Sequence, residues 1–116
     1  MAPQVRLAAF FLLAGSLHFL RPRLYVAIVP DALPHKREIV FASGVAEMAG
    51  GAGVLPARTR RLAAWWLIAT LIAIFPANVN MAVNADRFRS IPKHLLWARL
   101  PLQAALIAWV WRVAVR

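Results

Sequence analysis

The chain has 116 residues, 62% of them hydrophobic, and a mean hydropathy of +0.65. An ordinary soluble domain has about 45–50% apolar residues, so these values indicate a membrane protein. A bilayer span needs about 20 residues, and therefore this length allows one domain with at most four spans. The absence of cysteine excludes disulfides, thiol redox chemistry and iron–sulfur clusters.

The net charge of +10 comes from 14 Lys and Arg residues against 4 Asp and Glu. In a soluble protein this balance would suggest nucleic acid binding. Here the basic residues separate apolar runs and form no patch with interleaved aromatics, so we expect them to contact anionic membrane lipid. We predict no nucleic-acid partner.

Four segments bounded by basic residues or proline are long enough to cross a membrane. They cover residues 4–20, 37–55, 61–84 and 93–115. Short links make consecutive helices antiparallel neighbours. The predicted fold class is all-α: one membrane domain over residues 1–116, built as an integral membrane four-helix antiparallel bundle.

The first segment, MAPQVRLAAFFLLAGSLHFL, has an early Arg6 and an apolar core, as a signal peptide does. Cleavage would leave an odd number of spans and discard His18 or leave it near the new terminus, and no clear small-x-small site is present. We predict an uncleaved first span.

The first link, RPRLYVAIVPDALPHK, is the longest. Its three prolines bracket the apolar run LYVAIV, which predicts a segment that lies flat at the interface or dips back as a cap. The second link, PARTRR, predicts a tight basic turn. The layout places Trp65, Trp66, Trp109 and Trp111 at one headgroup level, and Tyr25 and Trp97 at the other.

The second segment contains ASGVAEMAGGAG, in which small residues recur four apart. The two series are Ala42, Ala46 and Gly50, and Ala49 and Gly53. A stripe of small residues allows two helix backbones to approach closely. We expect this stripe to pack beside Glu47.

The third segment ends in FPANVNMAVN, an unusual end for a lipid-facing helix. Pro76 is expected to free the carbonyl of Ile72 and to bend the helix, and Asn78 directs its amide at the same polar centre. Asn80 and Asn84 form a second pair four residues apart. In the fourth segment Pro101 frees the carbonyl of Trp97, so two kinked helices predict a polar cavity.

Five polar residues fall at membrane depth in the same half of the bilayer. The helical rise puts His18 about 5 Å in, Asn78 and Arg99 about 9 Å, and Glu47 and Gln103 about 15 Å. Because a lone charge in hydrocarbon costs several kcal/mol, we predict an ion pair between Glu47 and Arg99. Ser43 and Gln103 each lie one turn from a member of this pair. The alternative that the pair only fixes helix register stays open.

The candidate ligand-binding residues are His18, Ser43, Glu47, Asn78, Asn80, Arg99 and Gln103. No residue is assigned a catalytic role, and we predict no metal site. A bis-histidine haem needs two deep histidines, whereas His35 and His94 lie in links.

Both termini are expected on one side of the membrane. That side carries six basic residues and the other seven, so the positive-inside rule does not decide the orientation. We expect a bacterial inner membrane with the termini in the cytoplasm. The oligomeric state is open, and a homo-oligomer is one of the options.

Several ordered motifs resemble the DoxX-like family of small four-helix membrane proteins. They are GSLHFLRP, VPDALP, SGVAEMAGG, FPANVNMA and RLPLQ, spread over nearly the whole chain. The resemblance implies a four-span fold and a link to quinone-coupled electron transfer. The motif positions that carry over are His18, Glu47, Asn78, Arg99 and Gln103.

The leading functional hypothesis is an accessory or quinone-interacting subunit of a membrane redox system, with quinone as ligand and a redox partner protein that carries the electrons. One alternative is a small proton-coupled transporter, although a nearby Arg99 would hold Glu47 ionised and occupied. The other is a purely structural subunit, which requires a self-satisfied polar centre without a cavity.

Overall fold

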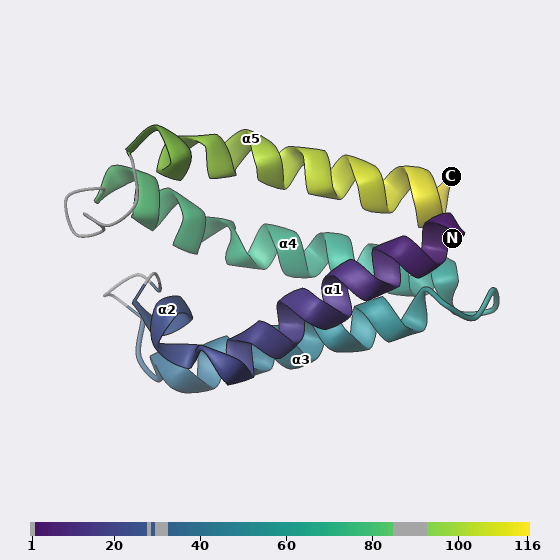
Figure 1. Cartoon of the computed structure of the whole chain (residues 1–116), viewed down its shortest axis with the longest axis horizontal. Helices are drawn as coiled ribbons and strands as arrows, with labels where there is room; N and C mark the ends of the chain where they lie inside the picture. Colours follow the sequence, from purple (N-terminus) through teal and green to yellow (C-terminus); the bar gives the residue numbers. More distant parts are fainter. Residues whose placement is uncertain (1, 28, 30–32, 85–92) are drawn as a thin grey trace.

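The computed structural model describes residues 2–27, 29, 33–84 and 93–116, without the side chains of residues 81, 82, 93, 95 and 96. These residues are almost all helical, and none of them forms a β-strand. The helices are α1 (Pro3–Leu20), α2 (Pro22–Val26), α3 (Lys36–Gly53), α4 (Arg60–Val83), α5 (Lys93–Val110) and the π-helix η2 (Trp111–Val115) (Figure 1). The all-α prediction is confirmed. Arg87 and Arg89, two of the seven basic residues counted on the side of the membrane away from the termini, lie outside the described residues.

The four long helices begin and end close to the predicted bounds. Three stretches are long and apolar enough to cross a membrane: Pro3–Leu20, Arg60–Asn80 and Trp97–Val115. The predicted span over residues 37–55 forms helix α3, which is not one of the three. Its sequence is rich in glycine and alanine and includes charged residues such as Arg37 and Glu47, so it is less apolar than its neighbours.

The turn between α3 and α4 is tight and basic, as predicted. Thr59 Oγ1 donates a hydrogen bond to the carbonyl of Gly53, and Arg60 Nε donates one to the carbonyl of Val54, both at 2.7 Å. These side chains satisfy carbonyls that the end of a helix leaves without partners, and the Arg60 charge lies at the negative end of the α3 dipole.

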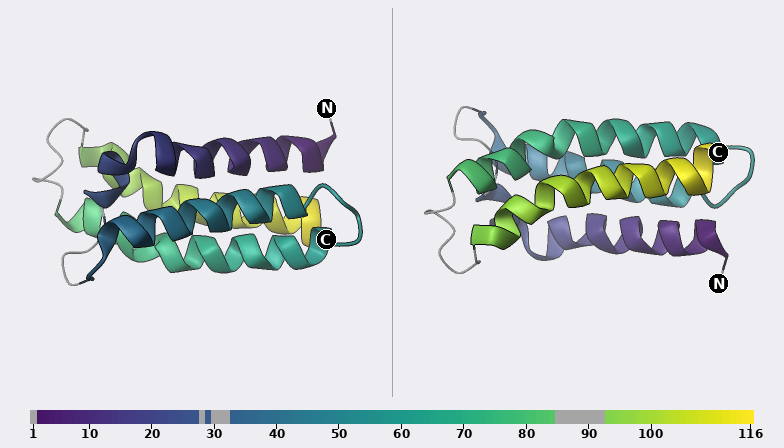
Figure 2. Two further views of the ribbon diagram at one scale, coloured as in Figure 1. Left: turned by 90° about the horizontal axis from the view of Figure 1, so that it is seen from below. Right: turned by 90° about the horizontal axis from the view of Figure 1, so that it is seen from above.

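The closest packing is between α1 and α3, followed by α4 with α5 and α3 with α4. Figure 2 shows the long helices running side by side, with the two chain termini at the same end. A Cβ added at Gly15 would lie 2.6 Å from the carbonyl oxygen of Gly44, and one added at Gly44 would lie 2.9 Å from that of Gly15. Glycine at both positions is therefore what allows α1 to touch α3.

The predicted small-residue stripe is partly wrong. The α1 face of α3 is made by Gly44 and Gly51, whereas Gly50 and Gly53 lie against α4. Ala42 and Ala49 are exposed. Small residues spaced four apart predicted one packing face, but α3 lies between two helices and uses two faces. Trp66 on α4 reinforces the second face by donating a hydrogen bond from Nε1 to the carbonyl of Ala46 at 2.9 Å.

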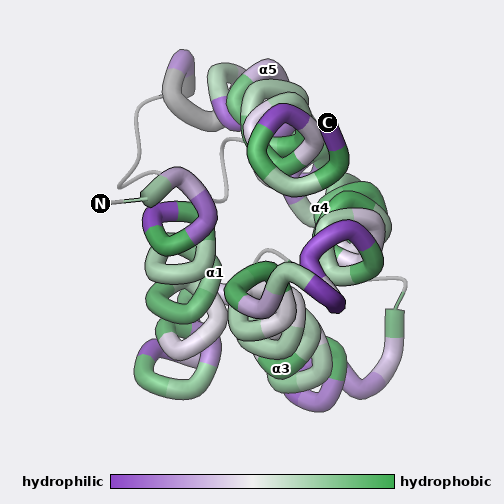
Figure 3. The backbone as a smooth tube through the Cα atoms, turned by 90° about the vertical axis from the view of Figure 1, so that its right-hand side faces the viewer, coloured by the Kyte–Doolittle hydropathy of each residue, from purple (hydrophilic) through white to green (hydrophobic). Residues whose placement is uncertain are grey.

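An apolar core fills the end of the molecule that bears the termini. Its fully buried large side chains are Leu7, Phe11, Val54, Leu67 and Val110. Hydrophobic residues also run along the outside of the long helices (Figure 3), and side chains such as Leu62 and Ile72 are exposed there. An apolar exterior of this extent suits lipid and not water. The buried polar residues line the cavity described next, to which the core residues Phe11 and Leu71 also contribute.

Candidate functional site

A cavity of about 320 Å³ lies between the helices and is lined by residues of α1, α2, α3, α4 and α5. Its walls are mostly apolar. Six predicted site residues line it, namely His18, Ser43, Glu47, Asn78, Arg99 and Gln103. The structure therefore brings together residues from four segments around one cavity, but the predicted polar character holds only in part because most of the walls are apolar.

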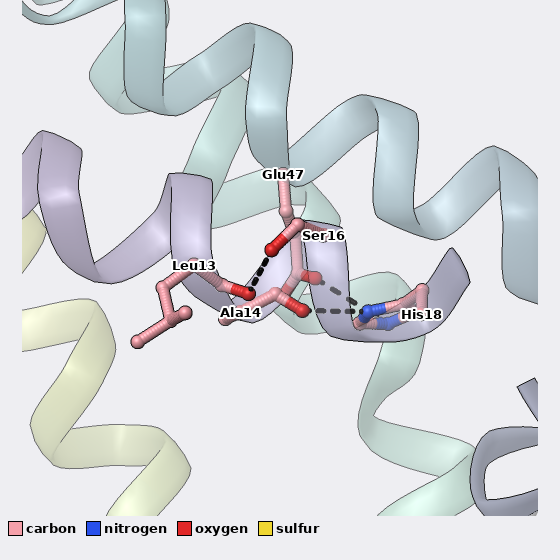
Figure 4. Close-up of polar contacts among 5 residues, drawn as sticks. All are labelled: Leu13, Ala14, Ser16, His18 and Glu47. Carbon is pink, nitrogen blue, oxygen red and sulfur yellow. Dashed lines mark hydrogen bonds and ion pairs between the residues drawn. The ribbon is translucent and has the colours of Figure 1, made fainter. Parts of the chain in front are cut away.

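One side of the cavity is built around His18 and Glu47, which face each other across the α1–α3 interface (Figure 4). His18 Nε2 lies 3.4 Å from Glu47 Oε2, and both residues are buried, with exposed fractions of 6% and 5%. The close approach at Gly15 and Gly44 places these two side chains at the same level. They form the buried acid–base pair of the site.

The second ring nitrogen of His18, Nδ1, determines how many protons His18 and Glu47 share. His18 Nδ1 lies 2.9 Å from the carbonyl oxygen of Ala14. A carbonyl only accepts hydrogen bonds, so Nδ1 carries a proton, and a neutral His18 then has a bare lone pair at Nε2. Because a carboxylate facing a lone pair is repulsive, one proton belongs between Nε2 and Oε2. The pair is neutral overall, either as two neutral groups or as an imidazolium and a carboxylate.

Two oxygens beside this pair lack hydrogen-bond partners within the described part of the chain. They are Glu47 Oε2, whose contact with His18 is too long for a good hydrogen bond, and Ser43 Oγ one turn away. Buried polar atoms are nearly always satisfied, by protein, water or ligand. Since both residues line the cavity, its contents are the natural source of the missing partners.

Tyr25 belongs to this side of the cavity, a role that the sequence reasoning missed. Its ring stacks on the His18 ring, with centroids 3.9 Å apart and planes inclined by 19°. Burial raises the pKa of its hydroxyl, the charge of Glu47 raises it further, and Arg99 opposes this rise. The hydroxyl is therefore a neutral donor at neutral pH. The sequence offered one signal for this role, which was the prediction that the first link could dip back as a cap. Helix α2 lies in this link, and it carries Tyr25 to the cavity.

The opposite side of the cavity is a chain of hydrogen bonds between α4 and α5. Gln103 Nε2 donates to the carbonyl of Leu71 at 2.5 Å, and Asn78 Nδ2 donates to Gln103 Oε1 at 2.5 Å. Arg99 Nε in turn donates to Asn78 Oδ1 at 3.4 Å. Pro76 was expected to offer the carbonyl of Ile72, but the carbonyl that receives a side chain is that of Leu71, one residue earlier.

The predicted ion pair between Glu47 and Arg99 is wrong. No contact of that kind joins them in the described residues; Glu47 faces His18, and the exposed Arg99 bonds to Asn78. Depth along each helix placed the two charges near one level but did not say which helices touch. Because α3 packs on α1 and α5 packs on α4, each charge meets a polar residue of its own packing partner.

Asn80 is the predicted site residue that does not line the cavity. Its Oδ1 accepts a hydrogen bond from Asn84 Nδ2 at 2.7 Å, so the predicted pair four residues apart is confirmed. Asn84 is exposed at the C-terminal end of α4. This pair lies at the exposed end of α4 and does not line the cavity.

A family model described as "Domain of unknown function (DUF8561)" matches residues 7–114. The chain belongs to this family. The matched region contains every residue that lines the cavity. No curated protein and no solved structure matches the chain.

In this DUF8561 member the cavity has the size and make-up of a small-molecule site. Such sites are mostly apolar, with volumes from about 300 Å³ and a few placed polar groups. One wall here can give or take a proton, through His18 and Glu47. The other offers amide and guanidinium groups from Asn78, Arg99 and Gln103. A largely apolar molecule with polar atoms at its edges matches this distribution.

Proposed function

We propose that this chain is an integral membrane four-helix antiparallel bundle that binds a quinone-type headgroup in its cavity, as an accessory subunit of a membrane redox system. A partner protein exchanges the electrons. The DoxX-like motifs support the same assignment, since GSLHFLRP supplies His18 and RLPLQ supplies Arg99 and Gln103. The cavity, with hydrogen-bonding groups on opposite walls, is the observation that carries the proposal.

Helix α3 serves as the fourth span in this proposal. Two of its faces are covered by α1 and α4. Gly44 and Gly51 approach the backbone of α1, and Gly50 and Gly53 lie against side chains of α4. Its deepest charged residue, Glu47, is buried against His18 and does not face lipid. A polar residue at membrane depth is tolerated when it faces the interior of a bundle. The modest hydropathy of α3 is therefore compatible with a helix that crosses the membrane.

A quinone suits the cavity because its ring is flat and apolar and its two carbonyl oxygens accept hydrogen bonds at opposite edges. On one wall the Tyr25 hydroxyl is a neutral donor beside His18. On the other, Arg99 uses Nε for Asn78 and has further N–H groups in its guanidinium. Donors on both walls would fix the orientation of the ring.

Thermal stability of the purified protein in detergent tests this proposal. A short-chain benzoquinone should raise the unfolding midpoint, with a stabilisation of about 2.7 kcal/mol at a concentration of 100 times Kd. Arg99→Gln should abolish the rise, and Arg112→Gln, which changes an exposed arginine outside this cavity, should keep it. No rise in the wild type at saturating quinone, or an equal rise in Arg99→Gln, would refute the proposal.

Proton-coupled transport is the second candidate, and one finding favours it. The sequence argument against transport was that Arg99 would occupy Glu47, whereas Glu47 instead shares a single proton with His18. Proteoliposomes with a pH gradient and a lipophilic cation test this candidate. Uptake that Glu47→Gln eliminates would support transport, and gradient-independent leakage in both forms would eliminate it.

The purely structural alternative requires a self-satisfied polar centre with no cavity. The cavity of about 320 Å³ counts against it, as do Ser43 Oγ and Glu47 Oε2, which make no good hydrogen bond within the described part of the chain. A protein used only for packing gains nothing from leaving buried polar atoms without hydrogen bonds.

A further inference from the structure

Helices α1 and α5 are the outer members of a packed series. The order of contact is α1 on α3, α3 on α4 and α4 on α5 (Figure 3). Near the termini the series is joined by an edge-to-face contact between Phe10 on α1 and Trp109 on α5, with ring centroids 5.5 Å apart. The seam between α1 and α5 is thus held at one end by aromatic side chains.

The same two helices also form a rim of the cavity, and this rim includes Phe10 itself. Phe10 from α1 and Leu102 from α5 both line it, yet their exposed fractions are 41% and 56%. A side chain that lines a cavity and is also exposed marks an opening. Other lining residues, such as Leu33, Ile39 and Pro76, are exposed too, but α1 and α5 are the neighbouring long helices with the weakest direct packing, so the lateral opening lies between them. The half-buried Leu106, one turn beyond Leu102, continues the apolar lining inward.

This opening lies on the lateral surface of two candidate membrane spans, Pro3–Leu20 and Trp97–Val115. In the proposed membrane bundle, the opening at that position faces lipid and not water. The rim residues Phe10 and Leu102 are apolar, as are Leu106 and the outward-facing Leu13 on α1. These side chains form an apolar surface that extends from the polar walls of the cavity to the proposed hydrocarbon of the bilayer.

We propose that the ligand enters sideways from the bilayer and that its apolar tail leaves the cavity between α1 and α5, past Phe10 and Leu102. This inference rests on the proposed function and narrows the ligand class to a lipid-borne quinone with a long hydrocarbon tail. The headgroup occupies the polar cavity, and the tail covers the apolar rim. A water-soluble quinone without a tail would leave the opening uncovered.

The chain has no cysteine, so a spin label can be attached at single introduced sites. Leu102→Cys and Phe10→Cys place the label on the two sides of the opening. Leu62→Cys is the matched control, because Leu62 is 76% exposed on α4 and does not line the cavity. The labelled proteins are placed in lipid nanodiscs and mixed with either a decyl-substituted benzoquinone or the same ring without the tail.

The decyl compound should abolish the mobile component of the spectrum at positions 102 and 10 and leave position 62 unchanged. The tailless ring should raise the unfolding midpoint in an Arg99-dependent way but leave all three spectra unchanged. The inference would be overturned if the spectra at both rim positions did not change with the decyl compound, or if they changed equally with the tailless ring. In either case the midpoint shift would still support the headgroup site. If neither compound shifts the midpoint, the proposed function fails and the inference fails with it.

Discussion

His18 Nε2 and Glu47 Oε2 lie 3.4 Å apart, and a hydrogen bond from Nδ1 to the carbonyl of Ala14 leaves room for one proton between them. The two side chains come from different helices, α1 and α3. Their approach depends on the contact between Gly15 and Gly44. A neutral acid–base pair is thereby held beside a cavity in a largely apolar protein.

The His18 ring both stacks on Tyr25 and contacts Glu47, and His18→Phe should remove only the second interaction. A phenyl group can still stack on Tyr25 but offers no partner to Glu47, so we expect a loss of about 1–3 kcal/mol for the buried carboxyl group left unsatisfied. Glu47→Gln should cost less, because its amide can donate to the bare Nε2. Thermal unfolding in detergent measures both. Equal midpoints for His18→Phe and the wild type would show that the contact contributes nothing to stability.

Gly44→Ala should destabilise the α1–α3 interface. The new methyl carbon would lie 2.8 Å from His18 Cβ and 2.9 Å from the Gly15 carbonyl oxygen. Overpacking of this kind typically costs about 1–3 kcal/mol. Ala42→Val, an enlargement at an exposed position of the same helix, is the control. Unfolding midpoints that drop equally in the two variants would argue against a specific close contact.

Gln103→Leu should remove two of the three hydrogen bonds that join α5 to α4 at the cavity. The amide of Asn78 and the carbonyl of Leu71 would be left without this partner, at a cost of about 1–3 kcal/mol for each buried group. Asn84→Ala, at the exposed end of α4, should stay within about 0.5 kcal/mol of the wild type. Reversible unfolding by denaturant distinguishes the two; a Gln103→Leu protein as stable as Asn84→Ala contradicts the hydrogen-bond chain.

Arg60→Gln should loosen the turn between α3 and α4. Its guanidinium donates to the carbonyls of Val54 and Leu55, at 2.7 Å and 2.9 Å. A typical hydrogen bond contributes about 0.5–1.5 kcal/mol net, and the neighbouring exposed Arg61 provides a matched control as Arg61→Gln. Limited proteolysis at the turn should be faster in the first variant. Identical cleavage rates would mean that the turn is held by other contacts.

Four of the seven predicted site residues are buried at the cavity because of one physical rule. A polar side chain inside an apolar helix is costly in lipid, so it turns toward the interior of the bundle. His18, Glu47, Asn78 and Gln103 follow this rule and are buried. Tyr25 was missed because it lies in a link, where the helical pattern of the spans gives no information about facing.

By itself, the sequence determined the all-α character, the helix bounds and the residues that avoid lipid, because composition, prolines and basic residues act locally along the chain. Only the tertiary structure decided which of those residues are partners. Glu47 meets His18 and not Arg99, since the contact of Gly15 with Gly44 brings α1 and not α5 against α3. Contacts between helices depend on how closely their backbones approach, and depth along a single helix does not contain that information.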